Sequence, residues 1–527
     1  MRGRLLSVVL GAMILVGLTY AQSRDQSVSA AIERDLDEVT ITALQALYAS
    51  GKYTVTQVTQ TYLNRIARYD AVYRSFIYVD TAGALSAAAA QDMAKKSAGT
   101  RFRPGPLWGI PVVVKGNTSI KGLVTTNGWE GYRIRGQELV APADATIVTK
   151  LKAAGAVILG HTNLPDFAAA DTTMSSVGGR TGNAYNWRFS PGGSSGGTAT
   201  AVSANFAVFG TGTDTSNSIR LPSGASGLVG VLPTRGLVSI HGIHPLDWLL
   251  DNAGPISRNV TDAAIALGVM AGEDPADFRT RDSAARAQKG PYTTYLKKDA
   301  LKGKRFGVPA FILDDPALRP ETRAMFTRAI EGVRAAGATV VVDDSILPAG
   351  FEEFTKAIET ETYMREGIEK FLQEFGPAQY HSMSEYMKAT GMSFPFFFSN
   401  TALRLLETDP SAERIFYAPQ RRALAAYQQT LDLLKLDGFV YPAIQMPPND
   451  ETVPGRRSDG PHTRTGWANT IGVPAVVVPG GYYADGLPFG IEFSGRPWKD
   501  GDLLGFAYAY EQATRYRKPP VLQSAPR

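Results

Sequence analysis

The sequence predicts an α/β fold: a single large domain with a central mixed β-sheet flanked by helices. One observation is that short β-branched runs alternate with amphipathic helical segments along the chain. The other is a composition of 44% hydrophobic and 20% charged residues, which is typical of a globular protein with a packed core. Length alone would suggest about three domains, but α/β enzymes of this size often form one continuous unit.

The N-terminal segment has the layout of a secretory signal peptide. Two arginines lie within Met1–Arg4, an apolar run covers Leu5–Leu18, and Thr19-Tyr20-Ala21 offers a small-residue cleavage pattern. We expect a signal peptide over residues 1–21, cleavage after Ala21, and a periplasmic or secreted mature chain over residues 22–527. An uncleaved N-terminal anchor is the alternative. The apolar run is short for a helix that spans a bilayer. After cleavage of the signal peptide, no stable membrane insertion is expected.

Composition excludes several classes of protein. The chain has no cysteine, so disulfides, thiol catalysis and Cys-ligated metals are ruled out. The formal net charge is +5 without a sustained Lys/Arg run, which argues against nucleic acid as a partner. No phosphate loop, dinucleotide fingerprint or paired metal-binding spacing is present, so neither a cofactor nor a metal is expected. The five histidines are scattered: His161, His241, His244, His381 and His462.

The first part of the mature chain, Ser29–Lys96, has a helical pattern. A short helix is predicted to end near Gly51, and Thr54–Gln57 reads as a capping box that starts the next helix. Ala82–Lys96 is predicted to be a third helix. These segments carry no candidate chemistry. The apolar positions that support the first two helices are Leu44, Leu47, Tyr48, Val58, Tyr62 and Ile66.

The alternation typical of an α/β sheet begins after Gly105. Gly109–Lys115 is apolar and β-branched, as expected of a buried strand. A helix over Asp144–Ala154 and a strand over Gly155–Gly160 follow. The same order is repeated further along, and two more core strands are expected near the C-terminus. These later segments are Lys304–Pro309, Pro320–Ala336, Thr339–Val342, Gly438–Pro442 and Val473–Val478.

The stretch Ser190–Ser218 is the candidate site. A Gly/Ser cluster at Gly192–Gly197 leads into a small-residue helix over Thr198–Phe206, a strand, and a second serine-containing turn over Thr213–Ser218. Hydroxyls on glycine-rich turns can expose a nucleophile beside free backbone N–H groups. A flexible Gly/Ser linker is the alternative reading. The apolar residues that follow Gly197 argue against it.

Lys115 lies at the C-terminal end of its predicted strand, and its role is open on sequence grounds. A lysine at such a position is usually a strand-end residue that extends its amine to solvent. Alternatively, burial lowers the pKa of the amine and makes it a general base near neutral pH. The sequence does not choose between these two readings.

Together these motifs resemble the amidase signature family. Gly192–Gly197 matches its glycine-rich serine segment, and Gly212–Arg220 matches the turn that follows it. Ser194 precedes Ser218 by 24 residues, which is the family's spacing. Gly109–Lys115 is similar to the family's lysine-bearing strand. The core of the resemblance spans residues 105–260, and it continues through most of the mature chain, at Ala153–Asn163, Asn469–Pro479 and Gly486–Glu492.

The resemblance implies an amidase, which hydrolyses a small-molecule amide to an acid and an amine or ammonia. It implies a Ser–Ser–Lys triad, in which Ser218 attacks the carbonyl and Ser194 relays its proton to a neutral Lys115. Water then hydrolyses the acyl-enzyme. The backbone N–H groups implied to form the oxyanion hole are those of Thr215, Ser216, Asn217 and Ser218.

The sequence departs from the family in two places. Gly116 follows the lysine where the family usually has an acid, and Ser216-Asn217 precedes Ser218 where the family usually has Gly-Gly. Asparagine adds a side chain near the acyl pocket, so we expect a changed substrate preference or rate. The alternatives are esterase or aryl-acylamidase activity on the same triad, and a catalytically silent binding protein with the same fold. A Ser–His–Asp triad built on His241 or His244 is a weaker one.

Partners are less constrained by the sequence. A glutamine-amidotransferase subunit is also known in the family, but an export signal would separate it from a cytoplasmic tRNA partner. The sequence leaves the oligomeric state open, and a homodimer is possible.

The regions around the site carry further expectations. A mainly helical region over about 360–436, with an aromatic patch at Phe394–Phe398, is expected to form a lid or pocket wall. Asn449–Arg464 reads as a mobile loop. Trp467 and Asn469 are expected to approach the pocket, and Asp214 and Arg220 to form an ion pair that stiffens the nucleophile turn.

Overall fold

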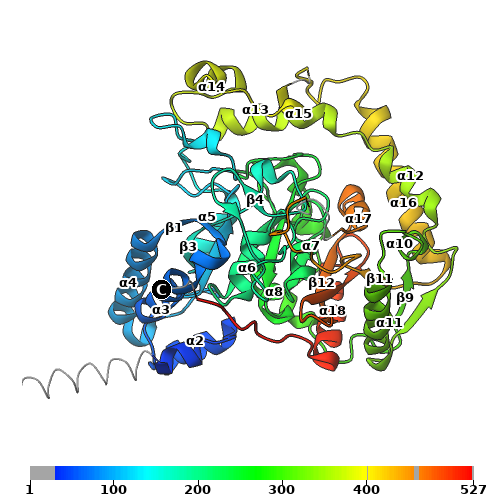
Figure 1. Cartoon of the computed structure of the whole chain (residues 1–527), viewed down its shortest axis with the longest axis horizontal. Coiled ribbons are helices and arrows are strands. Elements are labelled where there is room, and N and C mark those ends of the chain that lie inside the picture. Colours follow the sequence, from blue (N-terminus) through cyan, green and yellow to red (C-terminus); the bar gives the residue numbers. More distant parts are fainter. Residues whose placement is uncertain (1–29, 400–401, 456–461, 525–527) are drawn as a thin grey trace, which may run out of the picture.

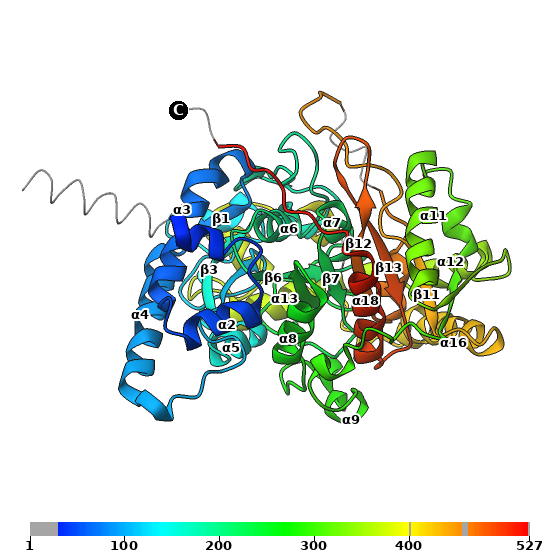
Figure 2. The same cartoon turned by 90° about the horizontal axis from the view of Figure 1, so that it is seen from below.

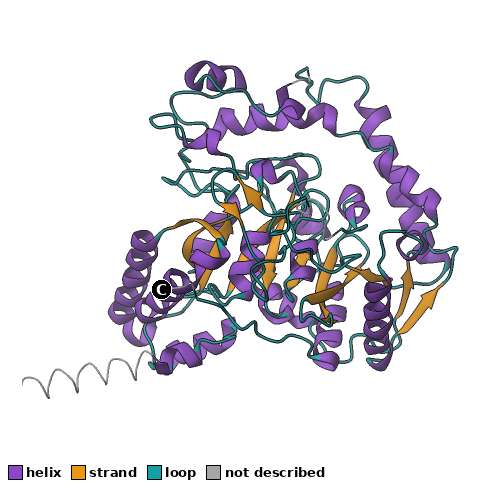
Figure 3. Ribbon diagram, in the orientation of Figure 1, coloured by secondary structure: helices purple, strands orange, loops and turns teal. Residues whose placement is uncertain are grey.

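A mixed β-sheet runs through the centre of the molecule, with helices on both sides (Figure 1, Figure 3). The computed structural model describes residues 30–524 except 400–401 and 456–461; the expected signal peptide lies outside these residues. The large sheet has 11 strands. In spatial order they are β1 (Phe76–Val79), β3 (Val157–Thr162), β2 (Pro111–Lys115), β6 (Phe209–Asp214), β8 (Asn252–Ser257), β7 (Val229–Leu232), β12 (Ala475–Tyr482), β13 (Pro488–Ser494), β11 (Gly438–Pro442), β9 (Arg305–Val308) and β10 (Thr339–Val342).

The sheet is parallel at two places and antiparallel elsewhere, which confirms the predicted α/β class. β2 pairs in parallel with both β3 and β6, and β9 pairs in parallel with β10 and β11. Every residue of β2 is buried, as expected of a parallel strand covered on both faces. Two helices that cover the sheet, α8 (Val260–Met270) and α18 (Asp500–Thr514), pack against each other in front of β7 and β12 in Figure 2.

The N-terminal helices agree with the sequence, except for one strand between them. The predicted capping box is present: the Thr54 hydroxyl accepts from Gln57 N–H at 3.1 Å, and Gln57 Oε1 accepts from Thr54 N–H at 3.0 Å. The expectation of an all-helical Ser29–Lys96 is wrong at β1, an edge strand antiparallel to β3. Four residues are too few for a period to show. The helices are α2 (Ile41–Ala49), α3 (Val55–Tyr73) and α4 (Thr81–Ala98).

The other predicted elements are present with small shifts at their ends. β3 continues past the predicted end at Gly160 to Thr162, and β6 continues to Asp214, into the segment predicted to be the second serine-containing turn. Both extensions consist of polar residues or glycine, which hydrophobicity does not mark as strand. The helices of this part are α5 (Thr146–Ala153), α6 (Gly196–Ser203), α7 (Arg220–Ala225), α9 (Ser283–Arg286), α10 (Ala310–Leu313) and α11 (Pro320–Ala335), and a small two-stranded sheet is formed by β4 (Met174–Ser175) and β5 (Gly179–Arg180).

A mainly helical segment forms an arch above the sheet in Figure 1, as predicted for about 360–436. An aromatic cluster attaches it to the body of the protein: Phe371, Tyr386 and Phe394 of the arch pack with Tyr132 and Phe167. None of the helices in the described part of the chain is long and apolar enough to cross a membrane. The helices of the arch and of the chain after it are α12 (Ala349–Lys356), α13 (Met364–Phe375), α14 (Met383–Thr390), α15 (Phe396–Ser399), α16 (Ala418–Leu433) and α17 (Gly466–Ile471).

Candidate active site

The three candidate catalytic residues come from neighbouring parts of the sheet. Lys115 is the last residue of β2, and β6, the parallel neighbour of β2, leads into the turn that carries Ser218. Ser194 precedes α6. Because parallel strands present their C-terminal ends at one edge, this topology brings the lysine and the second serine turn to the same end of the sheet.

Lys115 and Ser194 are in direct contact. The Lys115 amine Nζ lies 2.7 Å from Ser194 Oγ, 2.9 Å from Thr213 Oγ1 and 3.3 Å from the Thr213 carbonyl oxygen. Asn117 Nδ2 donates to the same Thr213 hydroxyl at 3.1 Å. The side chains of Lys115 and Ser194 are fully buried. The amine is therefore held in one orientation, facing the serine hydroxyl.

Burial lowers the pKa of Lys115 to about 7, while the carboxylates of Asp214 and Asp251 oppose the shift. A fully desolvated ammonium ion is penalised, and the contacts around it consist of neutral hydroxyl and carbonyl groups. The reading of Lys115 as a strand-end residue with its amine in solvent is therefore wrong. The amine is available in its neutral form near pH 7.

The two serine turns are tied together by the backbone. Ser195 N–H donates to the Ser218 carbonyl oxygen at 3.1 Å, and the Ser195 hydroxyl donates to the Thr213 carbonyl at 3.2 Å. The Gly193–Ser194 peptide is cis. Ser218 lines a cavity and is 6% exposed, whereas Ser194 is fully buried. Ser218 is thus the hydroxyl of the two that faces a ligand.

Close packing, not flexibility, explains the glycines of this segment. A Cβ atom on Gly197 would lie 2.3 Å from the Asn163 carbonyl oxygen, and one on Gly193 would lie 2.6 Å from the Thr172 carbonyl oxygen. Backbone atoms at that distance leave no room for a side chain. All residues from Gly192 to Gly197 are buried. The flexible-linker reading is therefore wrong.

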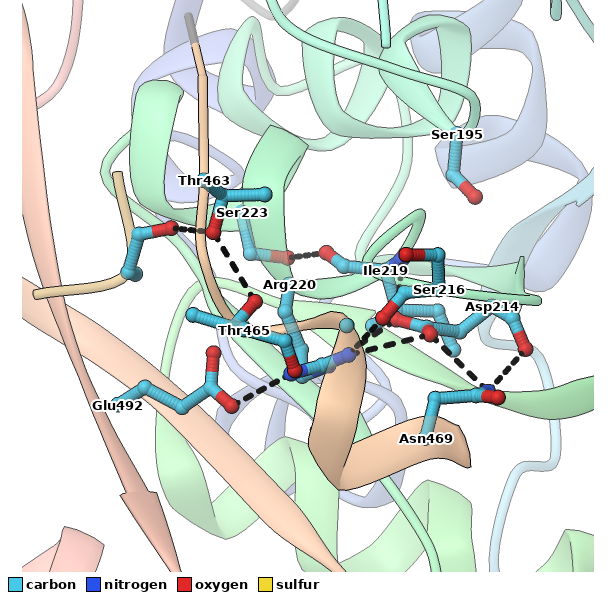
Figure 4. A network of polar contacts seen from close by, with 12 residues as sticks. Ser195, Asp214, Ser216, Ile219, Arg220, Ser223, Thr463, Thr465, Asn469 and Glu492 are labelled. Atoms are coloured by element: carbon cyan, nitrogen blue, oxygen red, sulfur yellow. Dashed lines mark hydrogen bonds and ion pairs between the residues drawn. The ribbon is translucent and has the colours of Figure 1, made fainter. Parts of the chain in front are cut away.

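The predicted ion pair beside the turn that carries Ser218 is present and fully buried (Figure 4). Asp214 Oδ2 accepts from Arg220 Nε at 3.2 Å and from Ile219 N–H at 3.0 Å. The guanidinium also donates to Glu492 at 2.6 Å and to the Ser216 carbonyl oxygen. Burial opposes the charge of Arg220, but the two carboxylates outweigh it and raise its pKa. Arg220 thereby joins the turn to β13.

The same turn presents free backbone donors to the cavity. Within the described residues, the N–H groups of Ser216, Asn217 and Ser218 have no hydrogen-bond acceptor. The neighbouring Thr215 hydroxyl donates to Asp251 at 2.5 Å, and burial raises the pKa of that aspartic acid to about 7. Adjacent N–H groups without acceptors are the arrangement that stabilises an oxyanion.

The cavity in front of Ser218 has a volume of about 1130 Å³. Two residues of the predicted aromatic patch, Phe396 and Phe397, lie on its wall. Trp467 instead packs in the core beside Tyr427, and Asn469 supports Asp214 by donating to its carbonyl oxygen at 2.7 Å (Figure 4). The residues lining the cavity are Ala168, Ala169, Ala170, Asp171, Thr172, Met174, Thr215, Ser216, Asn217, Ser218, Leu246, Glu361, Met364, Phe396, Phe397, Gly455 and His462.

The histidines of the signature region have structural partners. His244 lies 2.7 Å from the Tyr132 hydroxyl and 2.8 Å from Asn127 Nδ2, and burial lowers its pKa to about 3. His241 lies 2.8 Å from Glu374. These contacts do not support a triad with Ser218. Among the described residues, no cluster of three or more His, Asp or Glu side chains is arranged to hold a metal.

The chain resembles solved structures over more than nine-tenths of its length. The fold is shared with the crystal structure of a native peptide amidase from Stenotrophomonas maltophilia, with a TM-score of 0.78 and 32% identity over 92% of this chain and 99% of that one. An amidase family protein from Bacillus anthracis matches with a TM-score of 0.78 and 27% identity, over 94% of this chain and 95% of that one. The protein is an amide-hydrolysing enzyme. The Amidase family model matches residues 57–504, and the chain belongs to this family, the amidase signature enzymes.

Curated relatives that match this chain are named as subunits of an amidotransferase. A glutamyl-tRNA(Gln) amidotransferase subunit of Symbiobacterium thermophilum is 32% identical over 500 residues, which are 90% of this chain and 96% of that protein. The corresponding protein of Acinetobacter baumannii is 30% identical over 494 residues, 91% of this chain and 97% of that protein.

Sequence reasoning missed Thr213, Asp251 and Glu492 as supports of the site, and Asp171 on the cavity wall. Glu492 lay within a matching motif, but its partner Arg220 is 272 residues away. No local pattern links positions so far apart.

Proposed function

We propose that this enzyme hydrolyses a carboxylic amide through an acyl-enzyme on Ser218, with Ser194 and Lys115 as the proton relay. The observation that carries the proposal is the 2.7 Å contact between Lys115 Nζ and Ser194 Oγ in a fully buried setting. A serine hydroxyl is a weak nucleophile until a base removes its proton. A lysine whose pKa is about 7 supplies such a base without histidine.

The proposed reaction has two halves, acylation of Ser218 and hydrolysis of the acyl-enzyme. Ser218 Oγ attacks the carbonyl carbon as its proton moves to Ser194 and the proton of Ser194 moves to the neutral Lys115 amine. The negative charge on the carbonyl oxygen is stabilised by the free N–H groups of Ser216, Asn217 and Ser218. The C–N bond breaks as a proton returns through Ser194 to the leaving nitrogen. Water then attacks the ester carbonyl and passes a proton through Ser194 to Lys115. The bond between the acyl carbon and Ser218 Oγ breaks, the acid leaves, and the relay returns the proton to Ser218 Oγ.

A fluorophosphonate probe tests this proposal. It should label the folded protein once, on Ser218, and the Ser218→Ala variant should not react. Ser384→Ala, which removes an exposed hydroxyl from α14, serves as the matched control and should label normally. Folded wild-type protein that remains unlabelled would overturn the assignment of Ser218 as the nucleophile.

A role within an amidotransferase complex is the second candidate, because the relatives that carry this name match at 30–32% identity over nearly their whole length. The N-terminal segment up to Ala21 favours an exported enzyme over this role. N-terminal sequencing of the protein from its native host separates the two. A mature chain beginning at Gln22 supports export, and an intact Met1 in a complex with other subunits supports the amidotransferase.

A further inference from the structure

An unpaired hydrogen-bond acceptor lies on the cavity wall next to Ser218. Asn217 is 5% exposed and lines the cavity, and its Oδ1 atom has no hydrogen-bond partner among the described residues. Leaving a buried acceptor unpaired costs about 1–3 kcal/mol. Such an atom on a cavity wall, one residue before the candidate nucleophile, is available to a donor group of a ligand.

Asp171 lines the same cavity as Asn217. Burial raises the pKa of Asp171, and the Asn217 side-chain amide and His462 oppose that shift only in part. The carboxylate therefore lacks a full counter-charge, and a cation bound next to it would offset the cost of its burial.

The other charged groups around Asp171 also favour a cationic ligand. Asp214 also raises the pKa of Asp171, but its own charge is paired with Arg220. A second acid, Glu361, lines the same cavity, and His462 is the one basic side chain among the described lining residues. The titratable side chains of the described lining are therefore two carboxylates and one histidine, with no lysine or arginine.

We propose that Asn217 and Asp171 form a specificity site for a substrate with an ammonium group close to its scissile amide bond. The ammonium group would donate to Asn217 Oδ1 and to the free lone pairs of the Asp171 carboxylate. This inference rests on the proposed function of Ser218. It assigns a use to the asparagine that stands where the family usually has glycine: the side chain recognises the substrate from beside the nucleophile.

Matched pairs of amides test the proposal. β-Alaninamide is compared with butanamide, and N-acetylethylenediamine with N-propylacetamide; in each pair a methyl group replaces the ammonium group. At about pH 7 both amines are protonated. We expect kcat/KM for at least one ammonium substrate to exceed that of its methyl partner by about tenfold or more, equivalent to about 1.4 kcal/mol. A ratio near one in both pairs would overturn the proposal.

Two variants test whether Asp171 and Asn217 cause the preference for the ammonium substrate. Asp171→Asn removes the charge and keeps the shape, and Asn217→Gly removes the amide and restores the residue usual in the family. Both should reduce the ratio of kcat/KM values to within about twofold of one. Glu407→Gln, which neutralises an exposed acid of the arch, is the control and should keep the wild-type ratio. A wild-type ratio in Asp171→Asn would contradict the assignment.

A binding measurement separates this inference from the proposed function. In Ser218→Ala, calorimetry compares the affinities of the same ammonium and methyl amides without turnover. Tighter binding of the ammonium compound, lost when Asp171→Asn is added, supports the specificity site even if no amide is hydrolysed. Equal binding overturns it even if fluorophosphonate labelling confirms Ser218 as the nucleophile.

Discussion

The amine of Lys115 lies 2.7 Å from the hydroxyl of Ser194, and neither side chain is exposed to solvent. Thr213 holds the amine from the other side with its hydroxyl and its carbonyl oxygen. The contact is therefore made in a site where water does not compete, and where the protonation state of the lysine depends on burial.

Removing either partner of this contact should slow the reaction far more than it weakens substrate binding. We expect Lys115→Ala and Ser194→Ala each to lower kcat by about 10²–10⁴-fold, the usual range for a positioned acid–base group. Steady-state kinetics on any hydrolysed amide measures the effect. Lys121→Ala removes an exposed lysine that lies six residues further on and should leave kcat unchanged. Near-wild-type turnover in Lys115→Ala would refute the relay.

The activity should depend on pH through the same lysine. The pKa of Lys115 is lowered to about 7, and only the neutral amine accepts a proton. kcat/KM should therefore fall below about pH 7 and reach a plateau above it. A pH–rate profile on a substrate without a titrating group is the measurement. A profile that is flat from about pH 5 to about pH 9 would contradict the assignment.

Lys115 should also reduce the stability of the fold. Its pKa falls from an ordinary 10.5 to about 7 on folding, so the unfolded chain holds a proton that the native state releases between these pH values. At pH 6 this costs about 5 kcal/mol, against about 1 kcal/mol for each of the three hydrogen-bond contacts that the amine makes. Lys115→Met should therefore be more stable by about 2 kcal/mol at that pH.

Chemical denaturation at several pH values checks this prediction. The cost of Lys115 is fully present below about pH 7 and disappears as the pH rises towards 10.5, so the advantage of Lys115→Met should shrink over that interval. An advantage that grows with pH would show that the sign is wrong.

Arg220 should be essential for stability because it pairs with two buried carboxylates, Asp214 and Glu492. Arg220→Met leaves both without a counter-charge, and we expect a loss of about 3–5 kcal/mol in the free energy of unfolding. The shift in urea midpoint measures it. Arg68→Met breaks a surface contact of 4.0 Å with Glu33 and should change stability by less than about 1 kcal/mol. Similar losses in both variants would count against the role of burial.

Much of the fold could be predicted because its elements are encoded locally. The β-branched run ending at Lys115 and the capping box at Thr54–Gln57 each reside in one short segment, and the structure contains both. β1 was not predicted, because it is a strand of only four residues and is stabilised by its pairing with β3. The polar ends of β3 and β6 were missed because their burial comes from neighbouring strands, not from hydrophobic residues of their own.

The sequence by itself determined the family, the α/β class and the candidate residues Lys115, Ser194 and Ser218, because each lies in a motif with characteristic neighbours and spacing. Only the tertiary structure decided that the Lys115 amine is buried against Ser194 and not in solvent. It alone brought Glu492 to Arg220 and Asp171 to Asn217. The physical reason is that pKa, charge pairing and an unpaired acceptor depend on groups that are adjacent in space and remote in the chain.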